Sequence, residues 1–343
     1  MLKVAIVGTG QVAWDSARDL EKLRGCQIDS CCDVNLSKAR LFAKEFSVPK
    51  IFSSLEDLFL RGSVDAIINT TPDHMHYDVN RMALEQGVHI LSEKPLANTY
   101  KETRKLLQIA EGQDTIQMLH FDKRHDGPLL KARQLIQEGK LGRILHVEAS
   151  YLQSWLTSEC GGDWKEDDSL FWKLSGEYSS NGVINSIGID LLDAVTFLAG
   201  EVKRAQCFSR SFHKGVHGNK LKGIKLDSTD SAVLMAELKN DALATLHISR
   251  VATGESDNLF IAIYGDLGGL KLRVLDDDDY SLQICKGNDR HTAQWKDVSI
   301  PSSQCSAHNF IQAIKNNQLP EMAPTFEYAA QLQRLIEKSQ LTE

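Results

Sequence analysis

The chain has 343 residues, of which 42% are hydrophobic and 25% are charged, and it contains only seven prolines. This length predicts two domains with sizeable cores, and the composition is that of an ordinary folded protein. With 39 Lys and Arg against 46 Asp and Glu, the net charge of −7 has the wrong sign for a protein that neutralises phosphates, so nucleic acid is not an expected partner.

The cellular location can also be predicted from the sequence. No apolar stretch approaches the roughly 18 to 20 residues that span a bilayer, so no membrane association is expected. The first apolar run, at residues 4–7, ends in Gly8-Thr9-Gly10 instead of a small-residue cleavage site, which argues against a signal peptide. The seven cysteines are an odd number without Cys-x-x-Cys spacing. They predict reduced thiols in a cytoplasmic protein.

Residues 3–119 alternate short β-rich apolar runs with longer segments of 3.6-residue periodicity, which is typical of a parallel sheet covered by helices. The predicted strands are 4–7, 28–33, 50–52, 64–69, 88–92 and 115–119. The predicted helices are 13–23, 36–46, 55–60, 74–86 and 100–111. The fold class is therefore α/β, with an N-terminal Rossmann domain at 1–120 that binds its ligand outside the carboxyl ends of the strands.

The first predicted strand runs into Gly8-Thr9-Gly10-Gln11-Val12-Ala13, a Gly-x-Gly-x-x-Ala sequence directly before a helix. Such glycines permit a tight turn and let a pyrophosphate approach backbone N–H groups. Asp33 ends the second strand, where a carboxylate can accept hydrogen bonds from an adenosine ribose and repel a 2′-phosphate. The sequence therefore predicts NAD as the cofactor, with NADP less favoured. The residues predicted to contact the pyrophosphate and adenosine ribose of the cofactor are Gly8, Thr9, Gly10, Gln11, Val12 and Asp33.

Two later strands end in residues suited to chemistry. The fourth runs into residues 69–76, and the fifth runs into Glu93-Lys94-Pro95. Because the carboxyl ends of parallel strands share one edge of a sheet, Lys94 is expected close to the nicotinamide ring. A lysine there can protonate a carbonyl oxygen as hydride arrives, or accept a proton from an alcohol in the reverse direction. The alternative is a solvated surface lysine before a turn-forming proline.

The motifs Gly-x-Gly-x-x-Ala, Thr-Pro-Asp-x-x-His and Glu-Lys-Pro, at these intervals, resemble the glucose-fructose oxidoreductase / inositol dehydrogenase / rhizopine catabolism (Gfo/Idh/MocA) family. The likeness continues through residues 139–144 to the end of the chain. The resemblance implies that Lys94 handles the proton and that its bond to Pro95 is cis. It also implies cofactor contacts from Thr71, Pro72, His76, Glu93 and Lys94.

His74 and His76 are spaced so that they could chelate a metal ion. No carboxylate or cysteine cluster completes a coordination shell, so no metal site is expected. His76 can also be interpreted as a histidine packed in a helix-capping turn.

Beyond about residue 120 the pattern changes to a helix at 127–137 followed mainly by strands. The predicted strands are 143–153, 231–238, 242–250, 258–264, 270–274 and 280–285, and helices are predicted at 306–315 and 326–338. We therefore expect a second, α+β domain at 121–343 with a large, mostly antiparallel sheet for substrate binding and oligomerisation. Its last helix, about 325–339, is expected to pack back towards the first domain. By family likeness, the free face of the sheet predicts a homodimer or homotetramer.

Residues 181–193 align with a family segment in which Asp and His stand four residues apart, facing the substrate. Here the Asp position is Ser186 and the His position is Asp190. In an α-helix this spacing places both side chains over one patch. Three explanations remain open: Asp190 takes over the acid/base or orienting task with Lys94 while Ser186 supplies a hydrogen bond, other residues are recruited for an unusual substrate, or catalysis is lost.

The substrate-side candidates are Lys123, Tyr151, Trp172 and Asp190, with packing in a core as the alternative for the aromatic residues. The predicted function is an NAD-preferring oxidoreductase that interconverts a secondary alcohol and a ketone on a sugar, sugar acid or cyclitol. Two alternatives are a catalytically impaired cofactor-binding sensor and an NAD-dependent redox glycosidase.

Overall fold

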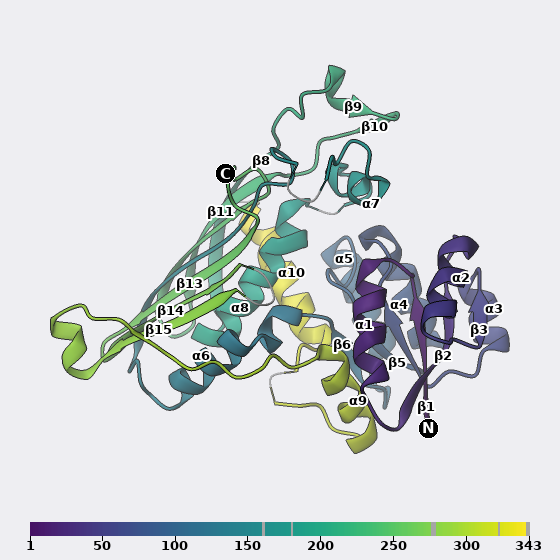
Figure 1. Cartoon of the computed structure of the whole chain (residues 1–343), viewed down its shortest axis with the longest axis horizontal. Helices are drawn as coiled ribbons and strands as arrows, with labels where there is room; N and C mark the ends of the chain where they lie inside the picture. The colour runs from purple at the N-terminus through teal and green to yellow at the C-terminus, as the bar shows by residue number, and fades with distance from the viewer. Residues whose placement is uncertain (160–161, 180, 276–278, 322, 341–343) are drawn as a thin grey trace. The chain divides into compact units, whose positions relative to one another are not determined.

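The computed structural model describes residues 1–159, 162–179, 181–275, 279–321 and 323–340 (Figure 1). The chain divides into two compact units. The first unit comprises Met1–Phe121 and Cys305–Gln331, and the second comprises Asp122–Gln304 and the chain from Leu332 onward. Within the described residues, no helix is both long enough and apolar enough to cross a bilayer.

The first unit is built on six parallel strands in the order β3-β2-β1-β4-β5-β6. The predicted doubly wound sheet is thus confirmed, and its strand order reverses between β1 and β4, which is where such sheets bind ligands. The strands are β1 (Leu2–Val7), β2 (Cys26–Cys32), β3 (Lys50–Phe52), β4 (Ala66–Asn69), β5 (His89–Ser92) and β6 (Gln117–Leu119).

The helices of the first unit begin at residues that can cap them. The Asn35 side chain accepts hydrogen bonds from the first turn of α2, and Thr99 and Glu102 form a capping box on α5. The helix predicted at 74–86 begins instead with a 3₁₀ turn, and its α-helical part starts at His76. The elements are α1 (Gln11–Glu21), α2 (Leu36–Glu45), α3 (Leu55–Arg61), η1 (Asp73–Met75), α4 (His76–Glu85), α5 (Tyr100–Ala110) and α9 (Ser306–Asn316).

The core of the first unit joins β1 to a helix from the far end of the chain. Val4 and Ile6 are fully buried and belong to one cluster with Phe310 and Ile311 of α9. The Leu119 N–H donates to the carbonyl of Pro324, so the segment after α9 follows the edge strand β6. The core of the first unit is therefore completed by a segment that follows the sheet of the second unit in the sequence.

The second unit holds an eight-stranded sheet in the order β16-β15-β14-β13-β7-β12-β11-β8. Among the strands of this sheet that the structure describes, only β7 and β12 pair in parallel, which confirms the mostly antiparallel sheet. The strands are β7 (Ile144–Gln153), β8 (Val202–Arg210), β11 (Ser231–Leu238), β12 (Leu243–Ser249), β13 (Asp257–Gly265), β14 (Gly268–Val274), β15 (Tyr280–Lys286) and β16 (Lys296–Asp297), and β9 (Lys220–Leu221) pairs with β10 (Ile224–Lys225).

Two helices cover one face of this sheet: α8 packs on β7, and α6 packs on β14 and β15 (Figure 1). All residues of α8 are buried; most of them are apolar, and the exceptions include Asp190 and Asp193. The helical elements are η2 (Asp122–His125), α6 (Gly127–Gln137), α7 (Asp168–Phe171), η3 (Trp172–Leu174), the π-helical η4 (Ile184–Gly188), α8 (Ile189–Ala199), η5 (His217–Asn219), η6 (Gly287–His291) and α10 (Phe326–Gln340), whose first residues belong to the first unit.

The cysteines in the described residues are free thiols, and Cys160 lies outside those residues. Burial raises the pKa of Cys31 to about 11 and that of Cys32 to about 12, with a further contribution from the negative charge of Asp33. Both side chains are therefore protonated core groups at neutral pH.

Candidate functional site

The carboxyl ends of five strands meet at one edge of the first sheet. The register places the last residues of β2, β1, β4, β5 and β6 side by side. The residues that follow them therefore emerge at the same edge. They are Asp33, Gly8, Thr70, Glu93 and His120.

The turn after β1 requires glycine at Gly8 and leaves open space at Gly10. Gly8 has a φ of +86°, and a Cβ there would lie 2.8 Å from the carbonyl oxygen of Thr70. Gly10 is the N-cap of α1, no side chain caps this helix, and a Cβ on Gly10 would have no atom within 4 Å. An open helix N-terminus with approachable N–H groups fits the pyrophosphate of a dinucleotide.

Asp33 is oriented by three donors. Its Oδ2 accepts the Thr9 N–H at 2.8 Å and the Thr9 hydroxyl at 2.7 Å, and its Oδ1 accepts the Asn35 N–H at 2.8 Å. The carboxylate is therefore fixed beside the glycine turn, where an adenosine ribose would lie. This geometry fits the role that the sequence predicts for Asp33.

His76 lies inside the first unit, with 1% of its surface exposed. Its Nδ1 is 2.6 Å from the Pro95 carbonyl oxygen and its Nε2 is 2.7 Å from that of Thr71. Both nitrogens are thus occupied by backbone carbonyls, which leaves neither for a metal ion. The ring supports the Thr71-Pro72 and Lys94-Pro95 segments from within, as in the packed-histidine interpretation of the sequence, and its contact with a cofactor stays a prediction.

Lys94 is half-buried at the sheet edge, and its peptide bond to Pro95 is cis, as the family resemblance implies. The preceding residue, Glu93, is anchored by its N–H to the Asn69 carbonyl at 2.8 Å, and its carboxylate makes a short contact with His120 Nδ1. His120 was not predicted as a site residue. Its only sequence signal is its position immediately after the last strand of the sheet.

A buried amide network, also not predicted, lies beneath this edge. Asn69 and Asn80 are both 0% exposed, and Asn69 Nδ2 donates to Asn80 Oδ1 at 3.0 Å. Asn80 Nδ2 donates to Ser92 Oγ at 2.9 Å and to the Leu96 carbonyl at 3.2 Å. The network therefore joins the end of β4 to both ends of the segment that contains Lys94.

In the second unit, Asp190 and Tyr151 lie in one buried cluster. Asp190 is 8% exposed on α8, and the Tyr151 hydroxyl on β7 donates to Asp257 Oδ2 at 3.2 Å. Burial raises the pKa of Tyr151 well above its usual value, and the negative charges of Asp257, Asp190 and Asp126 raise it further. Lys123 Nζ lies 3.8 Å from Asp126 Oδ2. The turn η2, which carries Lys123, and the strand β7, which carries Tyr151, both pack against α8, which carries Asp190.

Ser186 lies in a π-helical turn, Ile184–Gly188, directly before α8 begins. The segment between Ser186 and Asp190 is therefore a π-turn that continues into an α-helix and not one regular α-helix, and the shared patch of the two side chains stays a prediction. The Ser186 N–H donates to the Gly182 carbonyl at 3.1 Å.

Other basic and aromatic side chains of the second unit, among them the predicted Trp172, have the following surroundings. Arg124 is 2% exposed and forms a two-point ion pair with the buried Asp193 of α8. Trp164 belongs to a hydrophobic cluster with Phe171. Trp172 is half-buried in η3, and Lys173 Nζ lies 5.8 Å from the centroid of its ring.

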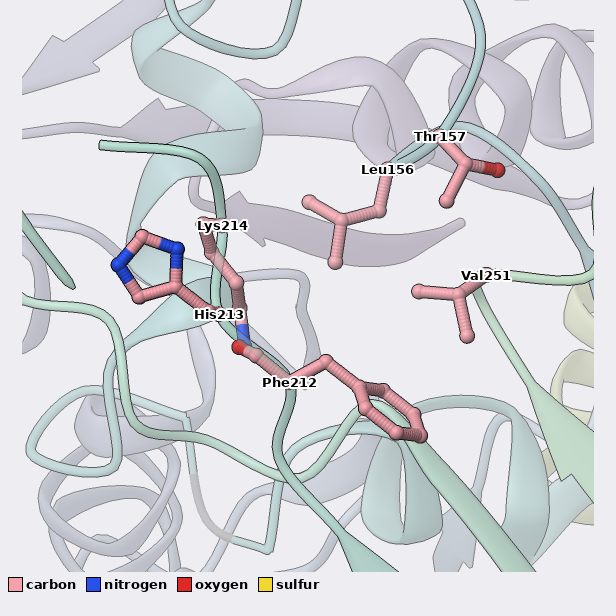
Figure 2. A pocket seen from close by; sticks show the side chains of 6 residues that line it. All are labelled: Leu156, Thr157, Phe212, His213, Lys214 and Val251. Carbon is pink, nitrogen blue, oxygen red and sulfur yellow. The ribbon is translucent and has the colours of Figure 1, made fainter.

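A cavity of about 250 Å³ in the second unit is lined by other residues: Leu156, Thr157, Phe212, His213, Lys214 and Val251. Leu156 and Val251 point towards the space above the Phe212 ring (Figure 2). The Lys214 ammonium is bound to the buried Asp230, to the Phe212 carbonyl at 2.8 Å and to Ser211 Oγ at 3.1 Å. The cavity is therefore walled mainly by apolar groups and contains none of the predicted site residues.

A glycine turn before an open helix end, with a carboxylate after the neighbouring strand, is how doubly wound sheets bind dinucleotides. Comparisons with known proteins agree with this class. Residues 2–121 match an oxidoreductase family with an NAD-binding Rossmann fold, and residues 129–271 match the Gfo/Idh/MocA C-terminal domain. The chain belongs to the Gfo/Idh/MocA family of oxidoreductases.

Several relatives are sugar dehydrogenases. A levoglucosan dehydrogenase from Pseudarthrobacter phenanthrenivorans is 24% identical over 74% of this chain, which spans 65% of the relative, just under two thirds of its length. A D-glucoside 3-dehydrogenase from Escherichia coli is 28% identical over 62% of this chain and 58% of the relative. A glucose-6-phosphate 3-dehydrogenase from Bacillus subtilis is 23% identical over 77% of this chain and 72% of the relative.

Solved structures show the same fold over nearly the whole chain. Levoglucosan dehydrogenase in complex with NADH and levoglucosan has a TM-score of 0.85 at 21% identity, covering 98% of this chain and 97% of that one. An oxidoreductase domain protein from Kribbella flavida has a TM-score of 0.84 at 25% identity, covering 98% of this chain and 96% of that one.

Proposed function

We propose that this protein is an NAD-preferring dehydrogenase that interconverts a secondary alcohol and a ketone on a sugar, sugar acid or cyclitol. The observation that carries the proposal is the single sheet edge at which the glycine turn, Asp33 and the Lys94 segment emerge. Pyranoses are the first substrates to test, because three relatives are named as dehydrogenases of levoglucosan, D-glucosides and glucose 6-phosphate.

In this proposal the backbone of residues 8–12 holds the pyrophosphate and Asp33 holds the adenosine ribose. A bound nicotinamide supplies the hydride chemistry. Lys94 accepts the hydroxyl proton during oxidation and returns it to the carbonyl oxygen during reduction. Thr71, Pro72 and Glu93 border the nicotinamide half.

On the substrate side, we propose that Asp190 orients a hydroxyl group as a hydrogen-bond acceptor. Its place on α8, close enough for its negative charge to raise the pKa of Tyr151, supports this role, because a carboxylate can accept hydrogen bonds from the hydroxyl groups of a polyol. Lys123, Ser186 and Trp172 are further candidate substrate contacts.

The test is a panel of substrates mixed with NAD or NADP, in which reduction is followed by NADH or NADPH absorbance. The panel contains levoglucosan, methyl glucoside, glucose 6-phosphate, gluconate and myo-inositol. We expect turnover with at least one compound and a higher kcat/KM with NAD than with NADP. NADH binding without turnover would favour a sensor, glycoside hydrolysis without net NADH would favour a redox glycosidase, and failure to bind NADH would contradict the proposal.

A further inference from the structure

Two buried side chains of α4 hold the segment that contains Lys94. His76 and Asn80 stand four residues apart, so they project from the same face of the helix. His76 contacts the carbonyl of Pro95, and Asn80 donates to Ser92 Oγ and to the carbonyl of Leu96. The contacts therefore lie on both sides of Lys94 in the chain.

Backbone groups fix the direction of the amide network. The Leu96 carbonyl can only accept, so Asn80 must turn its NH₂ group towards it. The Thr71 N–H can only donate, so Asn69 must turn its Oδ1 towards it, at 3.2 Å. Asn69 Nδ2 then faces Asn80 Oδ1, as observed. The Thr71 segment and the Lys94 segment are thus joined through two asparagines that each have one acceptable orientation.

We propose that Asn80 is a positioning residue for Lys94: it acts through the backbone of residues 92–96 and does not touch substrate or cofactor. This inference rests on the proposed role of Lys94 in proton transfer. Asn80 is 0% exposed, and loss of its amide removes one hydrogen bond each from Asn69 Nδ2, Ser92 Oγ and the Leu96 carbonyl. A buried polar group without its hydrogen bond costs free energy, and a shift of the backbone can restore the bond. The Lys94 segment should therefore move in the variant.

The first test uses the protein without cofactor or substrate. Lysine side chains are labelled with acetic anhydride at limiting reagent, and the extent of labelling at Lys94 is measured by mass spectrometry relative to the exposed Lys101. Asn80→Ala is expected to raise the relative labelling of Lys94 about threefold or more. The matched control is Val79→Ala, which removes a side chain buried to the same degree on the same helix and should leave the ratio unchanged. If Asn80→Ala does not fold, Asn80→Asp, which keeps the size but removes the amide donors, is measured instead.

The second test is a double-mutant cycle with the best substrate of the panel. Asn80→Ala is expected to lower kcat about tenfold to a hundredfold with the Kd for NADH changed by less than about twofold, because small misplacements of a reacting group cost rate. In the Lys94→Ala background, the same substitution should change the residual rate by less than about twofold.

The outcomes separate this inference from the proposed function. Full turnover in Lys94→Ala would remove the proposed role of Lys94. A large loss in Lys94→Ala with normal kcat and normal labelling in Asn80→Ala would overturn the positioning role alone, as would an equal loss of rate from Asn80→Ala in both backgrounds.

Discussion

Asp33 shows how a single residue at the sheet edge is prepared for its proposed ligand. Both of its oxygens already accept hydrogen bonds, from Thr9 and from the Asn35 N–H, so the carboxylate keeps one orientation. A fixed negative charge can accept hydrogen bonds from a ribose diol and repels a phosphate at the same place. The cofactor preference is therefore expected to depend strongly on this side chain.

Asp33→Ser should weaken NADH binding about tenfold, corresponding to about 1.4 kcal/mol, because a charged acceptor for the ribose is lost. NADPH binding should become tighter, because repulsion of the 2′-phosphate is removed. Fluorescence titration with both nucleotides measures the ratio of the two Kd values. Asp15→Asn, which removes a charge from an exposed position of α1, is the control. An unchanged Kd ratio in Asp33→Ser would exclude Asp33 as the discriminating residue.

The residues of this edge differ in how well the sequence predicts them. Gly8 and Asp33 are predictable because their roles depend on backbone geometry next to a strand end. Asn80 is not predictable, because a polar residue in a predicted helix is normally expected on the surface. Its hydrogen-bond partners are also 11 to 16 residues away in the chain. His120 depends likewise on a neighbour from another strand, Glu93.

At the scale of elements, the junction of β5 with the segment before β6 includes a titratable side chain. His89 Nδ1 accepts the Ile116 N–H at 2.9 Å, which requires an unprotonated nitrogen. Burial lowers the pKa of His89 below its ordinary value of 6.5, against a smaller opposite effect of Asp65. As pH falls below about 6.5, the unfolded chain binds a proton before the folded chain does. The stability contributed at this junction is therefore complete above pH 6.5 and is lost as pH falls towards the lower pKa of the folded state.

His89→Asn should make the free energy of unfolding less dependent on pH between about 7 and 5, because an amide oxygen can accept the Ile116 N–H without titrating. Urea denaturation at several pH values measures the difference between wild type and variant. A difference that stays constant across this range would contradict the assignment.

A second group of elements is held together by buried charges. Asp230, at the start of β11, binds Lys214 and accepts from Arg250 Nε at 2.9 Å and Nη2 at 2.8 Å. All three side chains are at most 2% exposed. Burial lowers the pKa of both cations, and the Asp230 charge opposes this effect. One carboxylate therefore favours the charged form of two buried side chains.

Asp230→Asn should reduce the free energy of unfolding by about 3 to 5 kcal/mol, because it leaves buried cations without a counter-charge. Glu237→Gln, which breaks the exposed ion pairs with Lys203 and Arg204, should cost less than about 1 kcal/mol. Urea titration of both variants tests the contrast. Equal losses of unfolding free energy in the two variants would contradict the larger contribution assigned to the buried ion pairs.

Elements with regular periodicity were predictable, and irregular ones were not. The strands of the first sheet follow apolar runs and were placed close to their observed positions. The edge strand β8 was not predicted, because its residues are half-buried or exposed and form no apolar run. The π-turn before α8 was not predicted either; at its end, Gly188 packs closely on Ile248, whose Cδ1 would lie 2.8 Å from a Cβ at Gly188.

At the scale of the whole molecule, the second unit presents an apolar outer face on the sheet opposite α6 and α8. Val233 pairs with Phe208, and Met235 lies two residues further along β11, so the three side chains share one face. They are 44%, 73% and 50% exposed, respectively. Contiguous exposed apolar side chains mark an interaction surface. We propose that two copies of the chain associate through this face, in line with the homodimer or homotetramer expected from the sequence.

Met235→Lys should shift the protein towards monomers, because the charge would be buried in the interface without a partner. Sedimentation velocity at several concentrations measures the change. The far-UV circular dichroism should stay the same, because Met235 is exposed within its own unit. A wild-type protein that sediments as a monomer, or a variant that keeps the wild-type assembly, would contradict this proposal.

Helix periodicity alone does not reveal which core a helix completes. The pattern at 306–315 predicts an amphipathic helix, but nothing local indicates that Phe310 and Ile311 join the core around β1. That partnership depends on a return of the chain across most of its length.

The central claim is that Lys94 transfers the proton at a bound dinucleotide, and the most direct measurement is the kinetics of Lys94→Ala beside its affinity for NADH. We predict that kcat falls about a hundredfold or more while the Kd for NADH changes by less than about threefold. Turnover at the wild-type rate, or loss of NADH binding with no separate effect on kcat, would contradict the account.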